Sequence, residues 1–517
     1  MKDQPPMNGA ESLVRSLSNA GVDVCFANPG TSEMQFVDAL DRTRLMRCVL
    51  GLFEGVVSGA ADGYARMAGK PAVTLLHLAP GMANAGANLH NAKKARSPML
   101  NLVGNHALRH LRYDAPLTAD LAGTAAVFSD WVRTAQSVET IAKDAIEGLA
   151  VAKGHPGRIA TLIAPADIGW EPGGVMVEPM EPSGPRALDK DMVKHAVAAL
   201  GPGCVIICGG TVLEDPASTR LLEGIAAQTG AELMAPTSNR RIERGAGRAA
   251  IPRVPYPINM AIERLSKFRR AILIEAQAPV AFFAYPDRPS LLLPEACEVI
   301  QLSDFDQDGR AAVQALADSI DAKPGQMADR PRITAPSAGP LTDHALSAAI
   351  VSALPEGAII IDESLTSATE VESMSAGAPP HSWLSLTGGA IGIGPPLATG
   401  AAIAAADRPV VTLQADGSAM YTIQALWTQA REQLNITTII FANKSYDLLK
   451  RELYNVGTNP GPDALNMLDL RRPELDFCAL AKGMGVPSAR VECAAELHRV
   501  LSAAINEPGP FLIEAIL

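Results

Sequence analysis

Short runs of apolar residues alternate with amphipathic segments along the chain of 517 residues. Runs rich in Val, Ile and Leu that are followed by turn residues are typical of β-strands, and they cover residues 22–30, 71–80, 97–105, 157–167, 203–210, 231–238, 269–279, 297–304, 357–364, 409–418, 436–445 and 509–517. Segments between them, such as 9–21 and 423–434, have apolar residues at helical spacing. Because alternating strands and helices are typical of parallel sheets covered on both faces, the pattern predicts an α/β fold.

Two stretches without periodic apolar positions divide the chain. Residues 171–189 and 322–340 are dense in Pro and Gly, as linkers between domains commonly are. We therefore expect three consecutive doubly wound parallel-sheet domains, at 1–170, 190–321 and 341–517. In such folds ligands bind at the carboxyl ends of strands, so the turns that follow the strands are the places to look for a site.

The charge balance excludes two classes of partner. The chain has 44 Lys+Arg and 55 Asp+Glu, a formal charge of 44 − 55 = −11. A nucleic-acid-binding protein needs a basic face, and anionic membranes attract basic segments. We therefore expect no nucleic acid and no membrane among the partners.

The cysteines and the apolar runs indicate a cytoplasmic protein. No CxxC pair occurs and the cysteine count is odd, which fits free thiols in a reducing compartment better than disulfides or a zinc ribbon. The first residues do not read as a signal peptide, and no run reaches the length of a membrane span. The seven cysteines are Cys25, Cys48, Cys204, Cys208, Cys297, Cys478 and Cys493.

Oxygen-bearing side chains follow two strands of the third domain. The strand at 409–418 ends in Ala415-Asp416-Gly417-Ser418, and Asn443 follows the next strand, 27 residues after Asp416. Carboxylate and amide oxygens together with phosphate suit Mg²⁺, and Gly417 allows a close approach of the backbone. The structural alternative is that Asp-Gly forms a turn, that Ser418 caps a helix and that Asn443 lies in an ordinary loop.

This pair of motifs resembles the diphosphate and magnesium motif of thiamine diphosphate enzymes, which is usually written GDG, about two dozen residues, then NN. Here Ala415 replaces the first Gly and Ala442 the first Asn, while Asp416 and Asn443 keep the ligand positions. The resemblance implies Mg²⁺ bound by Asp416, Asn443 and the backbone carbonyl of Ser445. It also implies thiamine diphosphate contacts at Gly417 and Ser418.

Glu54 opens a helical segment rich in small residues in the first domain. By the resemblance, its carboxyl group bonds the aminopyrimidine ring of the cofactor and promotes the tautomer that removes the proton from the thiazolium carbon. The structural alternative is a carboxylate that stabilises a helix N-terminus.

Three further positions are candidates for the site. Thr31, in the turn after the first strand, can face the substrate or cap a helix. His77, at the end of another strand, can transfer protons to a bound substrate or be a structural histidine. The third position is the segment from Thr387 to Gly392. By the resemblance, the Ile391 side chain supports the cofactor in a bent conformation. The backbone of Gly389 and Ile391 would hydrogen-bond the pyrimidine ring.

The resemblance covers almost the whole chain, as pyrimidine-binding, central and diphosphate-binding domains. It implies a homodimer or homotetramer with active sites at the subunit interface, since Glu54 of one copy meets the diphosphate site of another. The expected reaction is decarboxylation of a small-molecule 2-oxo acid with carbon–carbon ligation, as in acetolactate synthase.

Two alternatives remain open. Benzoylformate decarboxylase, a simple decarboxylase, has a His at the position of His77, but residues 279–285 lack the second His that this enzyme uses in its central domain. The altered GDG and NN motifs also allow a non-catalytic cofactor-binding or regulatory homologue. FAD is not expected, because the central domain lacks a Gly-x-Gly-x-x-Gly motif.

Overall fold

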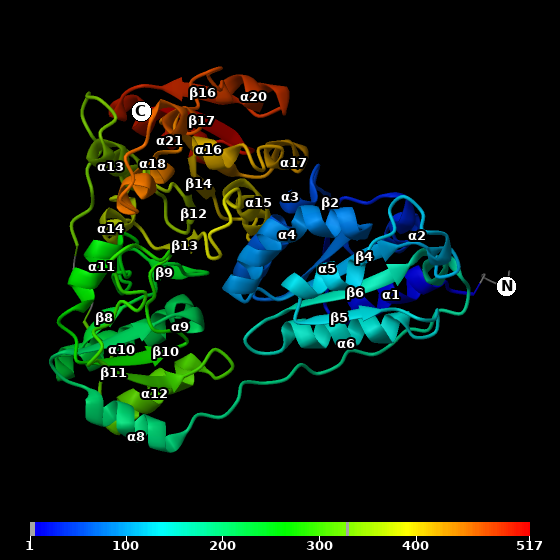
Figure 1. Ribbon diagram of the computed structural model, residues 1–517, viewed down its shortest axis with the longest axis horizontal. Coiled ribbons are helices and arrows are strands. Elements are labelled where there is room, and N and C mark those ends of the chain that lie inside the picture. Colours follow the sequence, from blue (N-terminus) through cyan, green and yellow to red (C-terminus); the bar gives the residue numbers. More distant parts are fainter. Residues whose placement is uncertain (1–5, 327–329) are drawn as a thin grey trace.

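The computed structural model describes residues 6–326 and 330–517, and it contains three sheets covered by helices (Figure 1). This confirms the predicted α/β class with parallel sheets. Residues 1–5 of the first expected domain and 327–329 of the second expected linker lie outside the described residues. The exact domain boundaries remain a proposal.

The N-terminal sheet is entirely parallel, with strand order β2-β1-β3-β4-β6-β5. Its strands are β1 (Val24–Ala27), β2 (Arg47–Leu50), β3 (Ala72–His77), β4 (Met99–Asn105), β5 (Trp131–Thr134) and β6 (Ile159–Pro165). The accompanying helices are α1 (Gly9–Asn19), η1 (Thr31–Glu33), α2 (Met34–Thr43), α3 (Glu54–Ala68), α4 (Leu78–Ala95), η2 (Leu111–Tyr113), α5 (Leu121–Phe128), α6 (Ile141–Lys153) and α7 (Ala166–Trp170).

The middle sheet has four parallel strands in the order β11-β10-β7-β8. They are β7 (Cys204–Cys208), β8 (Glu232–Met234), β10 (Arg270–Ile274) and β11 (Glu298–Ser303). Its helices are α8 (Lys190–Ala199), α9 (Gly210–Glu214), α10 (Pro216–Thr229), α11 (Ile258–Leu265) and α12 (Gly309–Ser319). A long extended segment connects α7 to α8 along the outside of the molecule (Figure 1).

The C-terminal sheet has seven strands in the order β16-β17-β15-β14-β12-β13-β9. They are β9 (Ile242–Arg244), β12 (Ile359–Glu363), β13 (His381–Ser385), β14 (Val410–Ala415), β15 (Ile436–Ala442), β16 (Ser488–Val491) and β17 (Phe511–Ile516). The helices are α13 (Asp343–Ala353), α14 (Val371–Met374), η3 (Ser375–Gly377), α15 (Gly394–Ala404), α16 (Asp416–Ala419), α17 (Ala425–Arg431), α18 (Asp447–Asn455), α19 (Pro462–Asn466), α20 (Phe477–Gly483) and α21 (Ala494–Asn506).

Strand β9 departs from the expected organisation. It comes from the segment assigned to the central domain, yet it pairs with β13 at the edge of the C-terminal sheet, and this is the antiparallel pair of that sheet. An ion pair supports it there, because the buried Arg244 guanidinium lies 3.0 Å from the partly exposed Glu372 carboxylate of α14. Two expected units therefore share one sheet.

Helices α3 and α15 pack so closely that their backbones touch. A Cβ atom on Gly63 would lie 2.0 Å from the Leu397 carbonyl oxygen, and one on Gly400 would lie 1.8 Å from the Ala60 carbonyl oxygen. Only glycine fits at these two positions, since real Cβ atoms do not approach a backbone oxygen so closely. This contact joins the N-terminal and C-terminal units.

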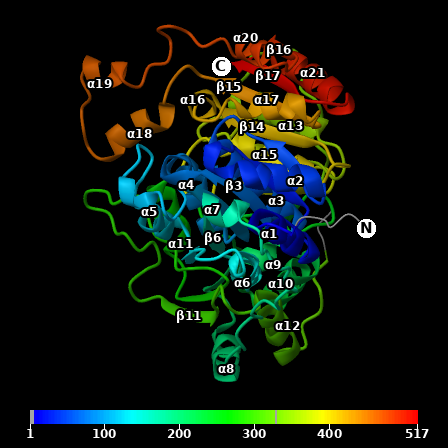
Figure 2. The ribbon, with the colours of Figure 1, turned by 90° about the vertical axis from the view of Figure 1, so that its right-hand side faces the viewer.

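Helices α18 and α19 project from the side of the C-terminal unit (Figure 2), and neither contains a buried residue.

Among the described residues, no helix is both long and apolar enough to cross a membrane.

Substituting Gly400 tests the α3–α15 contact. Gly400→Ala should lower the free energy of unfolding by about 3 kcal/mol or more, because the added methyl group must push the two backbones apart. Gly483→Ala is the matched control, since Gly483 is also helical but has open space around its Cβ position. Thermal unfolding measures the stability of both variants. Equal melting temperatures for the two would contradict the close approach of α3 to α15 at Gly400.

Candidate functional site

The carboxyl ends of β14 and β15 lie side by side, because Ala415 pairs with Phe441 in a parallel register. Asp416, the next residue after β14, is buried, and its Oδ1 and Oδ2 accept hydrogen bonds from the backbone N–H groups of Gly417 (2.7 Å) and Lys444 (2.6 Å). The turn after β15 is thereby tied to the turn after β14. Burial raises the pKa of Asp416 to about 6.

Asn443 and Ser445 lie in the turn that Asp416 holds. Asn443 Oδ1 accepts a hydrogen bond from the Ser445 N–H at 3.0 Å, and Lys444 between them has a left-handed backbone, with φ 56°. The Lys444 ammonium pairs with Glu474 at the surface. A buried carboxylate, an amide and backbone carbonyls beside it are the oxygen ligands that Mg²⁺ prefers, so the residues fit such a cation.

Gly417 and Ser418 shape the same turn. A Cβ atom on Gly417 would lie 2.6 Å from the Tyr446 ring, so the glycine lets the turn approach that side chain. Ser418 Oγ donates to the Ala415 carbonyl at 3.1 Å and accepts from the Gln414 amide at 2.6 Å. Its side chain is therefore engaged within the protein, which leaves its backbone as the part available to a ligand.

The turn between β13 and α15 contains Gly389 and Ile391. Gly389 has φ 77°, and a Cβ atom there would lie 2.7 Å from the ring of Phe282, which comes from the middle unit. Ile391 is half-buried. Glu363, at the end of β12, accepts hydrogen bonds from the N–H groups of Gly392 (2.6 Å) and Gly394 (2.7 Å), and burial raises its pKa to about 7.

Glu54 begins α3 with its side chain almost buried. Its Oε2 accepts a hydrogen bond from Asn84 of α4 at 3.0 Å. Gly81 lies next to its other oxygen, because a Cβ atom on Gly81 would lie 3.0 Å from Glu54 Oε1 and 3.5 Å from Cβ of His77. Glu54 and His77 are therefore neighbours at the carboxyl edge of the N-terminal sheet.

His77 ends β3 and is paired with a carboxylate that the sequence analysis missed. Its Nδ1 lies 2.7 Å from Oε2 of Glu33, which is fully buried and also accepts from the Gly30 N–H at 2.7 Å. Burial raises the pKa of Glu33. Because Glu33 fixes Nδ1, Nε2 of His77 is the nitrogen left for other partners. Thr31 is exposed at the start of the same short helix, η1.

The structure thus gathers the predicted residues into groups at strand ends. Asp416, Asn443 and Ser445 lie together, Glu54 and His77 lie together, and the turn with Gly389 and Ile391 is a third group. Within the described residues, no hydrogen bond links the Glu54 group directly to the Asp416 group. Glu33, Asn84 and Glu363 could not be singled out from the sequence, because their partners are distant along the chain.

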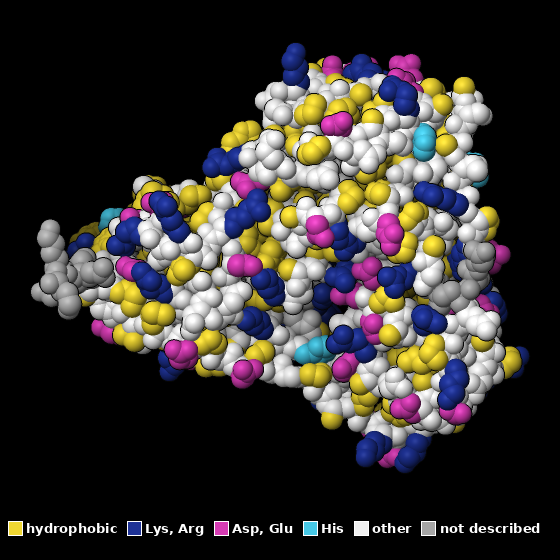
Figure 3. All heavy atoms as spheres, turned by 180° about the vertical axis from the view of Figure 1, so that it is seen from behind, with side chains coloured by type: hydrophobic (Ala, Val, Ile, Leu, Met, Phe, Trp, Pro, Cys, Tyr) yellow, Lys and Arg dark blue, Asp and Glu magenta, His cyan; other side chains and the backbone are white. Residues whose placement is uncertain are grey.

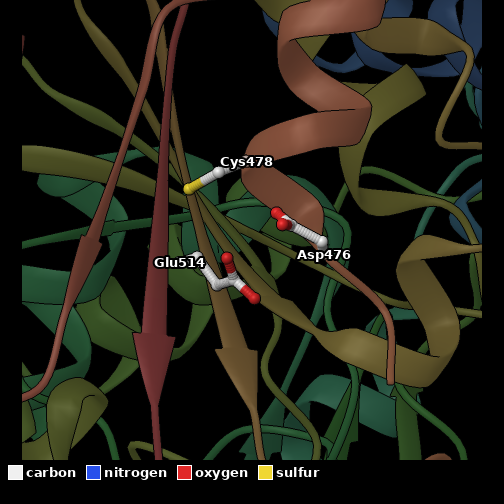
Figure 4. A group of neighbouring side chains, drawn as sticks. All are labelled: Asp476, Cys478 and Glu514. Carbon is white, nitrogen blue, oxygen red and sulfur yellow. The ribbon is translucent and has the colours of Figure 1, made fainter. Parts of the chain in front are cut away.

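A further set of potential metal ligands lies between α20 and β17 (Figure 4). The side chains of Asp476, Cys478 and Glu514 have ligand atoms within 4.8 Å of one another. Arg490, however, donates from Nε and Nη2 to Glu514 Oε2, at 3.1 and 3.0 Å, and its guanidinium also lies 3.4 Å from Asp476. Because this cation already neutralises the carboxylates, we assign no metal here.

A cavity of about 250 Å³ lies between the carboxyl edge of the middle sheet and the N-terminal unit. Arg96, whose guanidinium stacks on Phe305, forms part of its wall. Glu275 also lines it and is nearly buried, with its carboxylate accepting hydrogen bonds from the N–H groups of Thr211 (2.5 Å) and Gly309 (2.8 Å). The N–H groups of Thr211 and Gly309 at this sheet edge are therefore already bonded within the protein.

Two family models match the chain. Residues 7–124 match the thiamine pyrophosphate enzyme N-terminal TPP binding domain, and residues 367–515 match the C-terminal TPP binding domain. The first covers the strand ends with Glu54 and His77, and the second covers those with Ile391, Asp416 and Asn443.

Whole-chain comparisons agree with these models. A Mycobacterium tuberculosis protein provisionally named acetolactate synthase large subunit IlvX is 46% identical, over 99% of both chains. Benzoylformate decarboxylase of Pseudomonas aeruginosa is 29% identical, over 96% of both chains. The fold is similar to that of 4-hydroxybenzoylformate decarboxylase of Rhodococcus jostii, with a TM-score of 0.83, 23% identity and coverage of 98% of each chain. The chain therefore belongs to the thiamine pyrophosphate enzymes, among relatives of the acetolactate synthase and benzoylformate decarboxylase type.

Proposed function

We propose that the protein is a thiamine diphosphate- and Mg²⁺-dependent enzyme that decarboxylates 2-oxo acids and ligates the product to a second keto acid, as an acetolactate synthase does. The observation that carries this proposal is the full-length similarity to the IlvX protein, together with two buried carboxylates, Glu54 at the start of α3 and Asp416 directly after β14. A second candidate, simple decarboxylation of the benzoylformate decarboxylase type, is favoured by His77, which is paired with the buried Glu33 and lies beside Glu54.

Each residue has a distinct role in the proposed mechanism. When bound, thiamine diphosphate would supply the carbon nucleophile and the electron sink that decarboxylation of a 2-oxo acid requires. Asp416, Asn443 and the Ser445 carbonyl would hold Mg²⁺ and with it the diphosphate, near the Gly417 and Ser418 backbone. Glu54 would hold a proton at the aminopyrimidine, and Gly389 and Ile391 would orient that ring. His77 Nε2 would exchange a proton with the substrate, near Thr31.

We also propose a homodimer or homotetramer with cofactor sites between copies. Large apolar side chains are exposed on both cofactor-binding units, among them Leu52 before α3 and Tyr421 after α16. Figure 3 shows apolar side chains gathered in the recess between the N-terminal and C-terminal units. Such patches commonly mark interfaces, which supports association through this face. The expected cytoplasmic location remains a prediction.

We propose that FAD is not a cofactor. A dinucleotide would need N–H groups at the carboxyl edge of the middle sheet for its diphosphate. In the cavity described above, Glu275 uses the N–H groups of Thr211 and Gly309, and its own negative charge would repel a diphosphate.

Product analysis tests the choice of reaction. With pyruvate as the only substrate, in the presence of Mg²⁺ and thiamine diphosphate, we expect acetolactate as the main product. Formation of acetaldehyde without acetolactate would support the simple decarboxylase and contradict ligation. Chromatography of the products distinguishes these outcomes.

Removing the Glu54 carboxylate tests the catalytic assignment. Glu54→Gln should lower kcat by roughly 10²–10⁴, typical of losing a positioned acid–base group, while Gln can still accept the hydrogen bond from Asn84 and keep the fold. Glu171→Gln, at an exposed position, is the control. Unchanged turnover of the Glu54 variant would remove this residue from the mechanism.

Removing the proposed metal ligand tests cofactor binding itself. Asp416→Ala should lose saturable, Mg²⁺-dependent binding of thiamine diphosphate and the thermal stabilisation that goes with it. Asp407→Ala, exposed near the opposite end of β14, should behave like the wild type. Calorimetric titration measures both. If the wild type itself binds no thiamine diphosphate, the result favours a non-catalytic homologue that does not use this cofactor.

A further inference from the structure

Glu363 is a buried carboxylate that binds the backbone of the turn before α15. It ends β12 and is 1% exposed, and its Oε1 and Oε2 accept hydrogen bonds from the N–H groups of Gly392 (2.6 Å) and Gly394 (2.7 Å). Burial of a carboxylate is costly unless the group is paired or hydrogen-bonded. Here both of its oxygens are committed to the backbone that directly follows Ile391.

Gly392 is also held by Thr422. Thr422 is buried, and its Oγ1 donates to the Gly392 carbonyl at 2.7 Å. Gly392 has φ 92°, and a Cβ atom there would lie 2.5 Å from Cβ of Tyr421, so glycine is required for this close approach. The N–H and the carbonyl of Gly392 are therefore both bound by buried side chains, which come from two different segments of the C-terminal unit.

Thr422 belongs to the segment that begins at the proposed magnesium turn. Helix α16 starts at Asp416, and the chain continues from it in hydrogen-bonded turns, with the N–H of Thr422 bonded to the Ala419 carbonyl at 3.3 Å. The turn that contains Ile391 is therefore joined through Gly392 to the segment that contains Asp416.

We propose that Glu363 and Thr422 are positioning residues that fix how far the turn before α15 lies from the proposed magnesium turn. The inference rests on the proposed function, which gives Gly389 and Ile391 the aminopyrimidine contacts and Asp416 the metal and diphosphate contacts. These two sets of contacts come from the same copy of the chain, so bonds within that copy act on a single cofactor site. Because one cofactor would span both sets, a shift of either changes how its rings are oriented.

Glu363→Gln tests the hold on the turn in the cofactor-free protein. The amide keeps the size of the side chain but turns an NH₂ group toward one of the two N–H donors, so one bond is lost. Amide hydrogen exchange of Gly392 and Gly394 should become about tenfold faster, as expected for the loss of a hydrogen bond to a charged group. Glu275→Gln, in the middle unit, is the matched control and should leave this exchange unchanged, because Glu275 is similarly buried and also accepts from two backbone N–H groups.

Thr422→Val removes the second hold and keeps the shape of the side chain. It should also speed amide exchange at Gly392, and it replaces Glu363→Gln in every measurement if that variant does not fold. Thr438→Val is its control, because Thr438 is buried in β15 and its hydroxyl group has no hydrogen-bond partner among the described residues.

The cofactor-bound protein gives a second measurement. With Mg²⁺ and thiamine diphosphate bound, Glu363→Gln and Thr422→Val should each slow exchange of the thiazolium proton with deuterated solvent about tenfold, as expected for a misaligned proton-transfer group. The Kd for thiamine diphosphate should change little, because the diphosphate contacts stay in place. Both control variants should behave like the wild type.

The outcomes separate the positioning role from the proposed function. Unchanged amide exchange of Gly392 and Gly394 overturns the positioning role even if the wild type is an active enzyme. Unchanged exchange of the thiazolium proton overturns it as well, because the loosened turn would then not affect the cofactor. If Glu275→Gln slows that exchange equally, the effect is general destabilisation and the positioning role is wrong. A wild type that binds no thiamine diphosphate overturns the proposed function and the role toward the cofactor, but not the hold on the turn, which amide exchange measures separately.

Discussion

The close approach of α3 to α15 is the constraint on which the remaining geometry depends. With no side chain between the helices at Gly63 and Gly400, the relative position of the two cofactor-binding units is set by backbone contact. Glu54 lies at the start of α3, and the turn with Ile391 leads into α15. Within one copy, this backbone contact therefore fixes where the start of α3 lies relative to the turn that leads into α15.

A buried ion pair strengthens this contact from within α3. Arg66 and Asp62 are both fully buried, and the Arg66 guanidinium donates to Asp62 and also to the Ser385 carbonyl (2.8 Å) and Thr387 Oγ1 (3.0 Å) of the C-terminal unit. Buried charges are costly unless they are paired and hydrogen-bonded, and here nearly every donor has a partner. The same arginine therefore stabilises α3 and fixes the beginning of the turn that contains Gly389.

Much of the fold could be predicted from local sequence. The side chains that hydrogen-bond to distant segments of the chain could not. Predicted strands such as β14 and β15 are fully buried parallel strands, and their continuous apolar runs are distinctive. Strand β13 was missed because its polar residues resemble a loop. Ser382 is buried in it only because Glu243 and Arg408, from elsewhere in the chain, bond its hydroxyl group.

The same limit applies to the candidate site. Asp416, Asn443 and Glu54 were recognisable because they follow strands in motifs that resemble a family. Glu33, Thr422 and Glu363 have no motif, and their importance comes from partners brought close only by the fold. The neighbouring strand ends were predictable from the parallel topology, whereas the hydrogen bonds that orient each side chain were not.

One contact links the arm formed by α18 and α19 to the middle unit. Tyr285 Oη donates to Glu452 Oε2 at 2.7 Å, and α18 has no buried residue to anchor it independently. The helix that directly follows the proposed magnesium turn is thus tethered to a unit outside both cofactor-binding folds. The position of α18, and of the turn before it, is therefore coupled to the orientation of the middle unit.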